Sequence, residues 1–286
     1  MRDLGRDAED IDWVLARMAD LEADVWVLQD FDYDFDSLAL SAFAARAGFE
    51  HFLAAAPNTG VQTGVDLDGD GQLRGPRDAH GYGWFSGQGG LAILSRYPLT
   101  MLEDASDLIW ADLPWATLPE DFYTPEALAV LRLPHTAHWR IQVEAPEPFE
   151  LLTAYPTTPV FDGPEDRNGL RNADELKLLM QMAGRAEGPF VIAGDLNLDP
   201  ERGEGRRDEM AGLLSSGLVQ DTLPGRHTAD FGEDSAGKLR VSYVLPSPHW
   251  RVIDAGIAEA EAPSSRDVLF TRHHPVWVDL VLDSGG

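Results

Sequence analysis

The stretch VIAGDLN at residues 191–197 decides the fold. Its first residues are typical of a buried strand, and Gly194 permits a sharp exit that leaves two short polar side chains, Asp195 and Asn197, at the strand's carboxyl end. In α/β folds, this end of the strands carries the chemistry. A carboxylate and a carboxamide two positions apart suit a hard cation and a nucleophilic water, as phosphoester hydrolysis requires. The same residues are also typical of an ordinary turn, so the rest of the chain must decide.

Composition limits the classes to which the chain can belong. Its 286 residues are 44% hydrophobic and contain no low-complexity linker, so we expect one domain over residues 1–286. The 22 Lys and Arg against 49 Asp and Glu give a net charge of −27. Tight non-specific binding to nucleic acid depends on cationic groups that release counterions from phosphates, so this charge disfavours bulk nucleic acid as a partner.

The absence of cysteine restricts the chemistry further. Disulfides, thiolate nucleophiles and cysteine-ligated zinc are excluded, so any metal must bind to oxygen and imidazole ligands. No apolar run approaches a membrane span, and the first residues carry charge in place of an apolar signal region, so we expect no transmembrane segment. The sequence indicates no protein partner.

Hydrophobic periodicity predicts a mixed α/β fold. Many strands, few helices and large loops favour two packed sheets with helices outside them. The expected helices cover residues 10–21, 37–48, 172–186 and 207–215. The expected strands cover residues 23–29, 91–95, 129–133, 138–143, 149–155, 191–195, 239–246 and 274–282. Large loops are expected over residues 57–90, 108–125 and 156–171.

A motif similar to a calcium loop lies within the first of these loops. Asp66, Asp68 and Asp70 alternate with other residues around a tight glycine turn. Arg77 stands where an EF-hand would carry its bidentate glutamate, and Asp78 follows one place later. Two interpretations stay open. The segment is either a separate structural Ca²⁺ site that is not an EF-hand, or an acidic, turn-rich surface loop.

Polar residues at four expected strand ends, taken in order, carry a family resemblance. They are Gln29-Asp30, Tyr155, Gly194-Asp195-Leu196-Asn197 and the segment TRHHPV at 271–276. The segment RVSYV at 240–244 precedes the last of them. With these flanks the chain resembles the endonuclease/exonuclease/phosphatase superfamily, which includes deoxyribonuclease I, over nearly its whole length. The glycine-rich loop and residues 159–169 are more narrowly similar to an uncharacterised bacterial subgroup of it.

The resemblance implies both a fold and an activity. The fold is deoxyribonuclease I-like: a four-layered α/β sandwich of two packed, mostly antiparallel β-sheets flanked by helices. The activity is hydrolysis of a phosphomonoester or phosphodiester by metal-assisted attack of water, with Mg²⁺ or Mn²⁺ as cofactor. The acidic composition favours a small phosphoester over bulk nucleic acid as substrate.

The resemblance also implies roles for individual residues. Asp30 falls at the metal-binding position of the family. Asp195 would align or deprotonate the water, Asn197 would orient the phosphate, and His273 would stabilise the phosphoryl oxygens. Tyr155 falls where relatives carry His or Tyr and would donate a hydrogen bond to the phosphate. The alternative for Tyr155 is a half-buried aromatic residue with its hydroxyl in a loop.

Three further polar residues precede or begin the expected third helix. Arg167, Asn168 and Arg171 could meet a substrate phosphate, because a guanidinium and a helix start both suit that ligand. They could equally brace their loop against Asp162 and Asp166.

Three positions depart from the family pattern. Asp30 replaces a glutamate and is one methylene shorter, so an ion would have to shift or be held through water. Arg272 replaces a carboxylate near the metal, and Ser242 replaces the aspartate that hydrogen-bonds the catalytic histidine. This loss should lower the affinity of the imidazole for a proton and loosen its orientation. A catalytically degenerate member that acts as a binding or structural protein is therefore the alternative.

The start of the sequence also differs from the family. Relatives open with a central strand that carries an asparagine near the metal, whereas this sequence begins at what corresponds to the following loop. We therefore expect the first core strand to be missing, either because the start codon is misassigned or because the strand is absent. The protein would be extracellular or periplasmic if an upstream signal peptide has been lost, and cytoplasmic otherwise.

Overall fold

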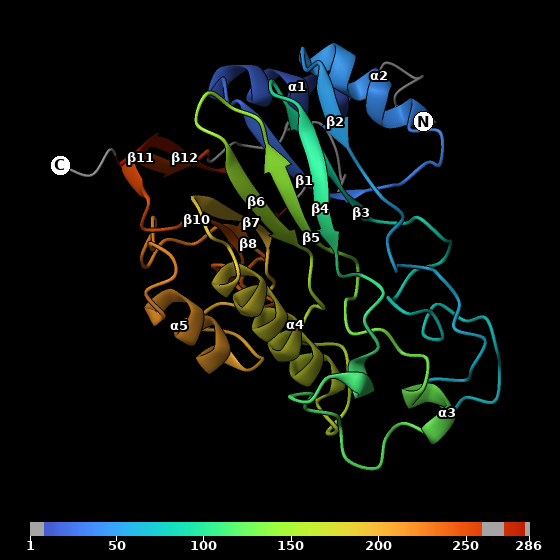
Figure 1. Cartoon of the computed structure of the whole chain (residues 1–286). Coiled ribbons are helices and arrows are strands. Elements are labelled where there is room, and N and C mark those ends of the chain that lie inside the picture. Colours follow the sequence, from blue (N-terminus) through green and yellow to red (C-terminus); the bar gives the residue numbers. More distant parts are fainter. Residues whose placement is uncertain (1–8, 259–271, 284–286) are drawn as a thin grey trace.

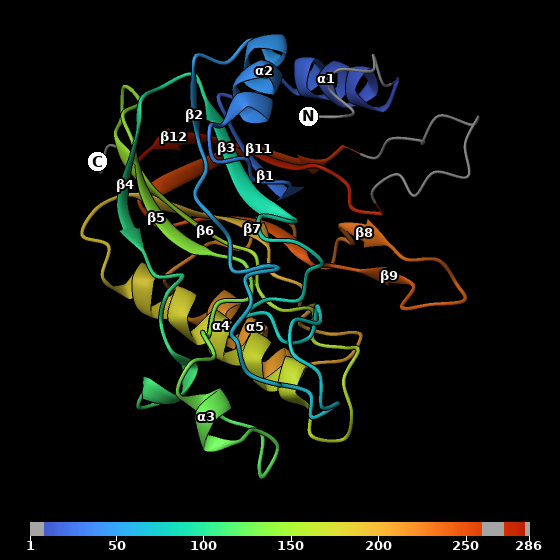
Figure 2. The same ribbon diagram turned by 90° about the vertical axis from the view of Figure 1, so that its right-hand side faces the viewer.

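A computed structural model describes residues 9–258 and 272–283 of the chain. Its elements lie in four layers, seen in Figure 1 and, after a turn of 90°, in Figure 2. Helices form the outer layers and sheets the inner ones, which confirms the predicted four-layered sandwich. The outer helices are α1 (Glu9–Leu21) and α2 (Leu38–Ala47) on one side, and α4 (Arg167–Gly184) and α5 (Arg207–Ser215) on the other.

The two inner layers differ in their strands. One layer contains an antiparallel sheet in the order β1-β3-β2, with β1 (Val25–Phe31), β2 (His51–Leu53) and β3 (Gly90–Ser95). The other is a five-stranded sheet in the order β10-β7-β6-β5-β4, in which only β6 and β7 run parallel. Its strands are β4 (Leu99–Asp104), β5 (His138–Val143), β6 (Phe149–Ala154), β7 (Phe190–Asp195) and β10 (Ser242–Pro246).

Further elements complete the described chain. Two pairs of strands are antiparallel and separate from the sheets above: β8 (Ala229–Asp230) with β9 (Lys238–Leu239), and β11 (Trp250–Ile257) with β12 (Val276–Leu282). The connection between β4 and β5 contains a 3₁₀ turn, η2 (Trp110–Asp112), and α3 (Pro125–Leu128). None of the helices in the described ranges is long and apolar enough to cross a membrane.

Three apolar cores fill the spaces between the layers. The side chains of β3 show how alternation divides a strand between two of them. Leu91 and Ile93 pack with residues of the five-stranded sheet, whereas Ala92 and Leu94 pack with residues of α1 and α2. A strand buried on both faces reads as a continuous apolar run, which is why the sequence predicts this one correctly.

The segment 129–133, which we predicted as a strand, is not one. Its residues Leu131 and Leu133 are buried, but their backbone groups form no ladder. The amide of Leu131 donates to the carbonyl of Ala127 and its carbonyl accepts the amide of Trp110, while the amide of Leu133 donates to the carbonyl of Leu108. An isolated bridge takes the place of a ladder here. Apolar alternation reports burial on one face and does not by itself report strand pairing, so the prediction was wrong.

Other boundaries also differ from the predictions. The expected strand 239–246 is divided into β9 and β10, and α4 begins at Arg167 instead of residue 172. Our strand predictions omitted β2, β4, β8 and β11. The side chains of β4 alternate between half-buried and exposed, so this strand lacks the continuous apolar run that identifies β3 and β7.

The strand β1 is less enclosed than the strands of the larger sheet. Within the described ranges it pairs only with β3, and most of its residues remain partly accessible. By contrast, all residues of β3 and β7 are buried. The expectation of a missing first core strand stays a prediction.

Candidate functional site

Asp30 lies in a β-bulge near the end of β1. The register of β1 against β3 shifts between Leu28 and Phe31, and Asp30 has a φ of 59°. Bulges redirect side chains, and aspartate tolerates this left-handed conformation better than most residues. Gly89 faces the carboxylate, since a Cβ at this glycine would stand 2.6 Å from Oδ1 of Asp30. The bulge therefore presents an accessible carboxylate at the end of the strand.

The electrostatic surroundings of Asp30 disfavour its charge. Its pKa is raised, first by partial burial and then by the neighbouring carboxylate of Asp32, whereas His273 acts in the opposite direction. Asp32 is held in place by the amide of Gly89, which donates to its Oδ1 at 3.0 Å. A bound cation would offset the repulsion between these two carboxylates.

Asp195 and Asn197 lie at the end of β7 and are fixed by its neighbours. Gly194 is required for close approach to β6, because a Cβ at this position would stand 2.5 Å from the carbonyl oxygen of Ala154. The amide of Asn197 donates to Oδ1 of Asp195 at 3.2 Å, and its Nδ2 donates to the carbonyl of Pro156 at 2.9 Å. One N–H of the Asn197 carboxamide therefore remains for another acceptor.

His273 lies beside Asp195. Its Nδ1 is 3.3 Å from Oδ2 of Asp195 and 3.4 Å from Oγ of Ser242, which pairs with Asp195 across the β10–β7 ladder. Burial raises the pKa of Asp195 to about 6, while His273 and the amide of Asn197 act in the opposite direction. A carboxylate of this pKa is ionised at neutral pH and accepts a proton more readily than an ordinary aspartate.

Tyr155 follows β6 and completes the cluster. Its pKa is raised, first by burial and then by the carboxylates of Asp195 and Asp30, so the phenol stays protonated and can donate a hydrogen bond. The structure thus brings together five of the predicted site residues from separate segments: Asp30, Tyr155, Asp195, Asn197 and His273.

The cluster has the donor types that a hard divalent cation prefers. Asp30 offers an accessible carboxylate, and Mg²⁺ commonly binds through one or two carboxylates, with water and substrate phosphate as its other ligands. Among the described residues, one group of three acidic side chains is close enough to enclose an ion. It consists of Asp66, Asp68 and Asp78 in the loop between β2 and β3, and not of the residues around Asp30. The residues around Asp30 therefore fit an ion held largely through water, as its short side chain also suggests.

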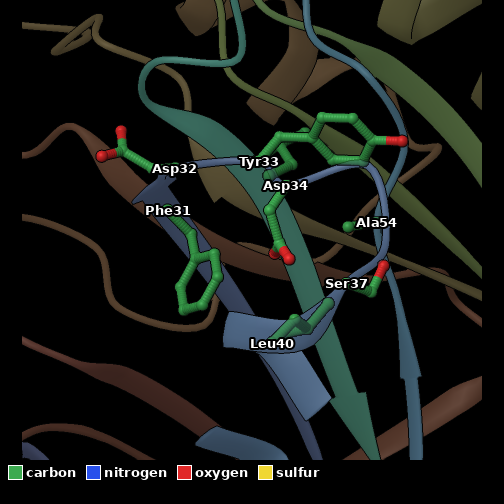
Figure 3. A pocket seen from close by; sticks show the side chains of 8 residues that line it. Phe31, Asp32, Tyr33, Asp34, Ser37, Leu40 and Ala54 are labelled. Atoms are coloured by element: carbon green, nitrogen blue, oxygen red, sulfur yellow. The ribbon is translucent and has the colours of Figure 1, made fainter. Parts of the chain in front are cut away.

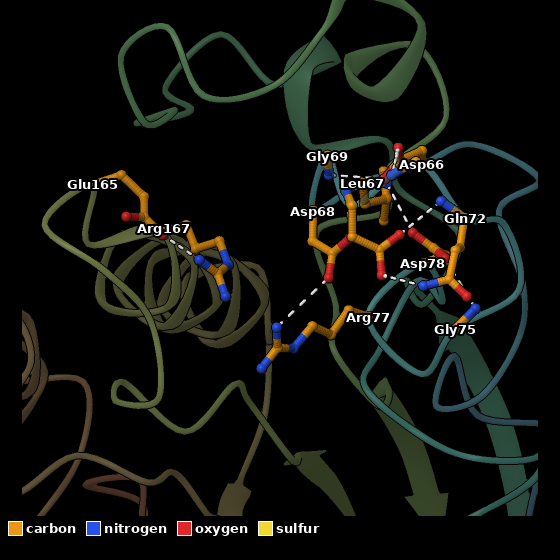
Figure 4. A network of polar contacts seen from close by, with 12 residues as sticks. Asp66, Leu67, Asp68, Gly69, Gln72, Gly75, Arg77, Asp78, Glu165 and Arg167 are labelled. Carbon is orange, nitrogen blue, oxygen red and sulfur yellow. Dashed lines mark hydrogen bonds and ion pairs between the residues drawn. The ribbon is translucent and has the colours of Figure 1, made fainter.

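Arg167 and Asn168 begin α4 and are engaged by their own loop. The guanidinium of Arg167 binds Glu165, as Figure 4 shows. The amide of Asn168 donates to Oδ2 of Asp162 at 2.6 Å, and its Nδ2 donates to the carbonyl of Val160 at 2.7 Å. Both residues therefore brace their own loop, Asn168 against the predicted Asp162 and Arg167 against Glu165.

Arg171 is directed into the protein. It is 7% exposed, and its guanidinium donates to the carbonyls of Leu133 at 2.8 Å, Arg132 at 2.7 Å and His80 at 2.6 Å. These bonds occupy both Nε and Nη2, and their acceptors are carbonyls of other segments in place of the Asp162 and Asp166 of our bracing alternative.

Glu175 lies one turn further along α4 and supports the loop that carries the partner of Asn197. We did not predict this residue from the sequence. Its carboxylate accepts the amides of His135 and Thr157, each at 2.7 Å. Burial raises the pKa of Glu175 to about 7. Thr157 follows Pro156, whose carbonyl anchors Asn197, so this helix fixes the loop beneath the carboxamide. A glutamate on the buried face of a predicted helix was the only signal in the sequence.

The acidic loop between β2 and β3 gathers three carboxylates, shown in Figure 4, but not the three that we predicted. One oxygen from each of Asp66, Asp68 and Asp78 lies within 4.8 Å of the others. Asp70 is outside this group, and its Oδ1 accepts the amide of Gln72 at 2.7 Å. Asp78, one place beyond the EF-hand glutamate position, was the signal that could have identified the third member.

Both interpretations of this loop stay open. Asp78 is 2% exposed, and its two oxygens accept the amides of Leu67 and Gly75, each at 2.9 Å. Asp66 likewise accepts the amide of Gly69 at 2.7 Å. Backbone amides therefore stabilise these carboxylates already, while each carboxylate keeps lone pairs that could bind Ca²⁺.

A shallow pocket follows Asp30 along the chain, and one of its lining residues stabilises the start of α2. Figure 3 shows its lining, which includes Phe31, Tyr33, Asp34 and Leu40. Oδ2 of Asp34 accepts the amide of Leu38 at the first turn of α2. The carboxylate thus satisfies a helix N-terminus, as a capping residue does, and is not directed at the cluster around Asp195.

Comparisons with known proteins agree with the architecture. A model of the endonuclease/exonuclease/phosphatase family matches residues 3–272. An endonuclease/exonuclease/phosphatase from Beutenbergia cavernae DSM 12333 has a similar structure, with a TM-score of 0.61 and 18% sequence identity. The match covers 96% of this chain, which spans 66% of the length of that protein. None of the curated proteins matches the sequence.

Two further solved structures share the fold at similar distance. The 3′ phosphatase NExo from Neisseria, bound to a product DNA hairpin, has a TM-score of 0.56 at 17% identity. An AP endonuclease from Archaeoglobus fulgidus has a TM-score of 0.56 at 14% identity. Each match covers 96% of this chain and 94% of the other. Identities this low are informative about the fold alone.

Proposed function

Because the chain belongs to the endonuclease/exonuclease/phosphatase family, whose members hydrolyse phosphoester bonds, we propose that it cleaves a small phosphomonoester or phosphodiester with the help of Mg²⁺ or Mn²⁺. The observation that supports this most is the buried carboxylate of Asp195, 3.3 Å from the imidazole of His273. Such a pair places a carboxylate that can act as a base next to an imidazole that can interact with phosphoryl oxygens.

Each residue of the cluster has a separate task in this proposal. Asp195 accepts a proton from water, whose oxygen forms the new bond to phosphorus as the bond to the leaving oxygen breaks. The imidazole of His273 and the hydroxyl of Tyr155 stabilise the charge on the phosphoryl oxygens, and the free N–H of Asn197 orients them. Asp30 would hold the cation, which supplies further charge stabilisation when bound.

The charge of the chain bears on the substrate. Of the similar structures, NExo is described with DNA and another is an AP endonuclease, so nucleic acid is one substrate to consider here. A net charge of −27 opposes long polyanions, because few cations are present to replace their counterions. A small phosphoester avoids most of this repulsion, so we place it first.

Hydrolysis of two model substrates tests the proposal. Bis-p-nitrophenyl phosphate and p-nitrophenyl phosphate are incubated with the protein and Mg²⁺, Mn²⁺ or Ca²⁺. We expect metal-dependent release of nitrophenol from one of them, and loss of that release in Asp195→Asn. Asp20→Asn is the matched control, since this exposed aspartate on α1 is paired with Arg17 at the helix surface. Equal rates for the wild type and Asp195→Asn would contradict the proposal.

A catalytically degenerate binding protein is the second candidate. The observation in its favour is Ser242, whose hydroxyl at 3.4 Å supplies no negative charge to His273, at the position where the family has an aspartate. This candidate predicts that a phosphate ester binds without being cleaved. Isothermal titration calorimetry with a non-hydrolysable phosphonate would detect binding, and the nitrophenol assay would show rates no higher than those of metal in buffer.

A cation at the acidic loop is a separate question from catalysis. We propose Ca²⁺ at Asp66, Asp68 and Asp78, because this group supplies three oxygen ligands from one segment. The alternative is a loop stabilised only by its backbone amides.

A further inference from the structure

The backbone on either side of His273 is held by the β8–β9 hairpin. The amide of Asp230 donates to the carbonyl of Arg272 at 2.9 Å, and the amide of His274 donates to the carbonyl of Thr228 at 2.8 Å. Between these bonds, Ala229 and His273 form an antiparallel bridge. The hairpin thus fixes the position from which the imidazole extends.

The ring of Phe231, the next residue of the hairpin, packs directly on the imidazole. The centroids of Phe231 and His273 are 5.5 Å apart, and the planes of the two rings are 88° from parallel. This is the edge-to-face geometry that aromatic pairs prefer. In addition, Nη1 of Arg272 donates to the carbonyl of Phe231 at 3.0 Å. Phe231 therefore contacts His273 through its ring and Arg272 through its backbone carbonyl.

The same hairpin is bonded to the strand that carries Ser242. Oγ1 of Thr228 accepts the amides of Val241 and Ser242, each at 2.9 Å. The distance of 3.4 Å from Oγ of Ser242 to Nδ1 of His273 is at the long end of the range for a hydrogen bond. The carboxylate of Asp195 and the hydroxyl of Ser242 both meet the imidazole at Nδ1. Contacts at one atom leave the ring plane less restrained than a contact on the ring itself, so a contact on the ring would contribute to its orientation.

We propose that Phe231 is a positioning residue for His273, and that its ring, together with the bond from Arg272, holds the imidazole plane so that Nδ1 stays next to Asp195. The cation at position 272, which departs from the family pattern, then has a local use: it secures the hairpin that carries the aromatic ring. The kinetic part of this inference rests on the proposed function, whereas the placement of the ring does not.

A purely structural role for Phe231 is less consistent with its surroundings. The three buried cores of the described chain do not include it. It is half-buried on a short hairpin, so shortening its side chain leaves no large internal cavity. Its main ring partner among the described aromatic contacts is His273. Substitution should therefore change the imidazole more than the overall stability.

The first experiment does not require activity. Proton–carbon NMR spectra of the metal-free protein are recorded for the wild type, Phe231→Leu and Phe231→Tyr, and the His273 signals are identified by their loss in His273→Gln. We expect the ring-current shift of the His273 carbon-bound protons to disappear in Phe231→Leu and to persist in Phe231→Tyr. Thermal melting verifies that all variants are folded. Unmoved His273 signals in Phe231→Leu, or equal losses in both variants, would overturn the proposal.

The second experiment measures the consequence for hydrolysis. If the imidazole is held by the ring, Phe231→Leu lowers kcat about tenfold with little change in KM, and Phe231→Tyr restores it. In a Ser242→Asp background, where a carboxylate again orients His273, Phe231→Leu has a much smaller effect. An undiminished effect in that background overturns the positioning role. If the wild type hydrolyses nothing with any of the three metals, the proposed function fails, and the NMR result still decides the placement of the ring.

Discussion

The two strands that end in the acidic residues of the site are supported very differently. β7 lies between β6 and β10 and is buried along its whole length, and Asp195 at its end is 4% exposed. β1 pairs with β3 alone within the described ranges, and Asp30 occupies an accessible bulge near its end. Strand ends of similar sequence thus present the same functional group in two environments.

This difference assigns different chemistry to identical side chains. Burial raises the pKa of Asp195 to about 6, which suits a group that exchanges protons. Asp30 keeps an accessible face beside a second carboxylate, Asp32, which suits a group that binds a cation with its water ligands. In the proposed function, the environment of each aspartate, and not its position after an apolar run, therefore distinguishes the base from the metal ligand.

The largest expected effect is on hydrolysis, where substitutions of Asp195 and Asp30 should behave differently. Asp195→Asn should lower kcat by about 10²–10⁴-fold at every Mg²⁺ concentration, because the base is lost. Asp30→Asn should instead raise the Mg²⁺ concentration needed for half-maximal rate, and excess Mg²⁺ should restore much of the activity. Steady-state rates over a Mg²⁺ titration check this. Rescue of Asp195→Asn by Mg²⁺ would reverse our assignment of the two residues.

The next effect concerns stability and pH. The pKa of Asp195 is about 6 in the folded protein and about 3.9 in an unfolded chain, so between these values the folded state binds more protons. Its contribution to the free energy of unfolding is therefore fully present below about pH 4 and is lost as the pH rises through 6. Relative to the wild type, Asp195→Asn should gain up to about 3 kcal/mol between pH 4 and pH 8.

Thermal or urea unfolding of metal-free protein at these two pH values measures this difference. Asp30→Asn is the matched comparison and should change less, since its carboxylate is accessible. A constant difference between Asp195→Asn and the wild type across the pH range would show that Asp195 is not the group that titrates.

A smaller effect tests the rigid side of the comparison. In Gly194→Ala the new Cβ would stand 2.5 Å from the carbonyl of Ala154, so β6 and β7 must separate, at a cost of about 2 kcal/mol. Gly184→Ala is the control, because no atom lies within 4 Å of its Cβ. Urea unfolding gives both values. Equal stabilities for the two variants would mean that the approach of β6 and β7 is not tight.

The smallest expected effect is a gain in stability when Ca²⁺ binds the acidic loop, independently of the site around Asp195. If Asp66, Asp68 and Asp78 bind Ca²⁺, an ion at ten times its Kd adds about 1.4 kcal/mol to the free energy of unfolding and raises Tm by a few degrees. The rise should persist in Asp195→Asn and vanish in Asp68→Ala. Differential scanning fluorimetry with Ca²⁺ and EDTA measures it. A rise that survives in Asp68→Ala would place the ion elsewhere.

The sequence was most informative where apolar runs end in short motifs. The segments β3 and β7 are buried on both faces, so they read as continuous apolar runs, and the placement of Asp195 and Asn197 followed from the second. The failure at residues 129–133 has the opposite cause. There the buried leucines belong to an irregular connection, whose path depends on distant backbone partners.

The candidate site was predictable only in part for a similar reason. Asp30, Asp195 and His273 belong to local motifs, so their identities could be read from the sequence before their contacts were known. The partners of Arg171 could not, because they are backbone carbonyls on separate loops. Phe231 has no motif at all, and only the folded hairpin places its ring beside His273.

Arg171 has a consequence for the order in which the molecule folds. Its partner His80 is 91 positions away along the chain, and Leu133 is 38 positions away. Contacts across such loops carry a large closure entropy and tend to form after local structure, when the helix already exists. In stopped-flow measurements, Arg171→Met should therefore accelerate unfolding far more than it slows refolding. The same guanidinium that braces the loops would thus set the lifetime of the native state.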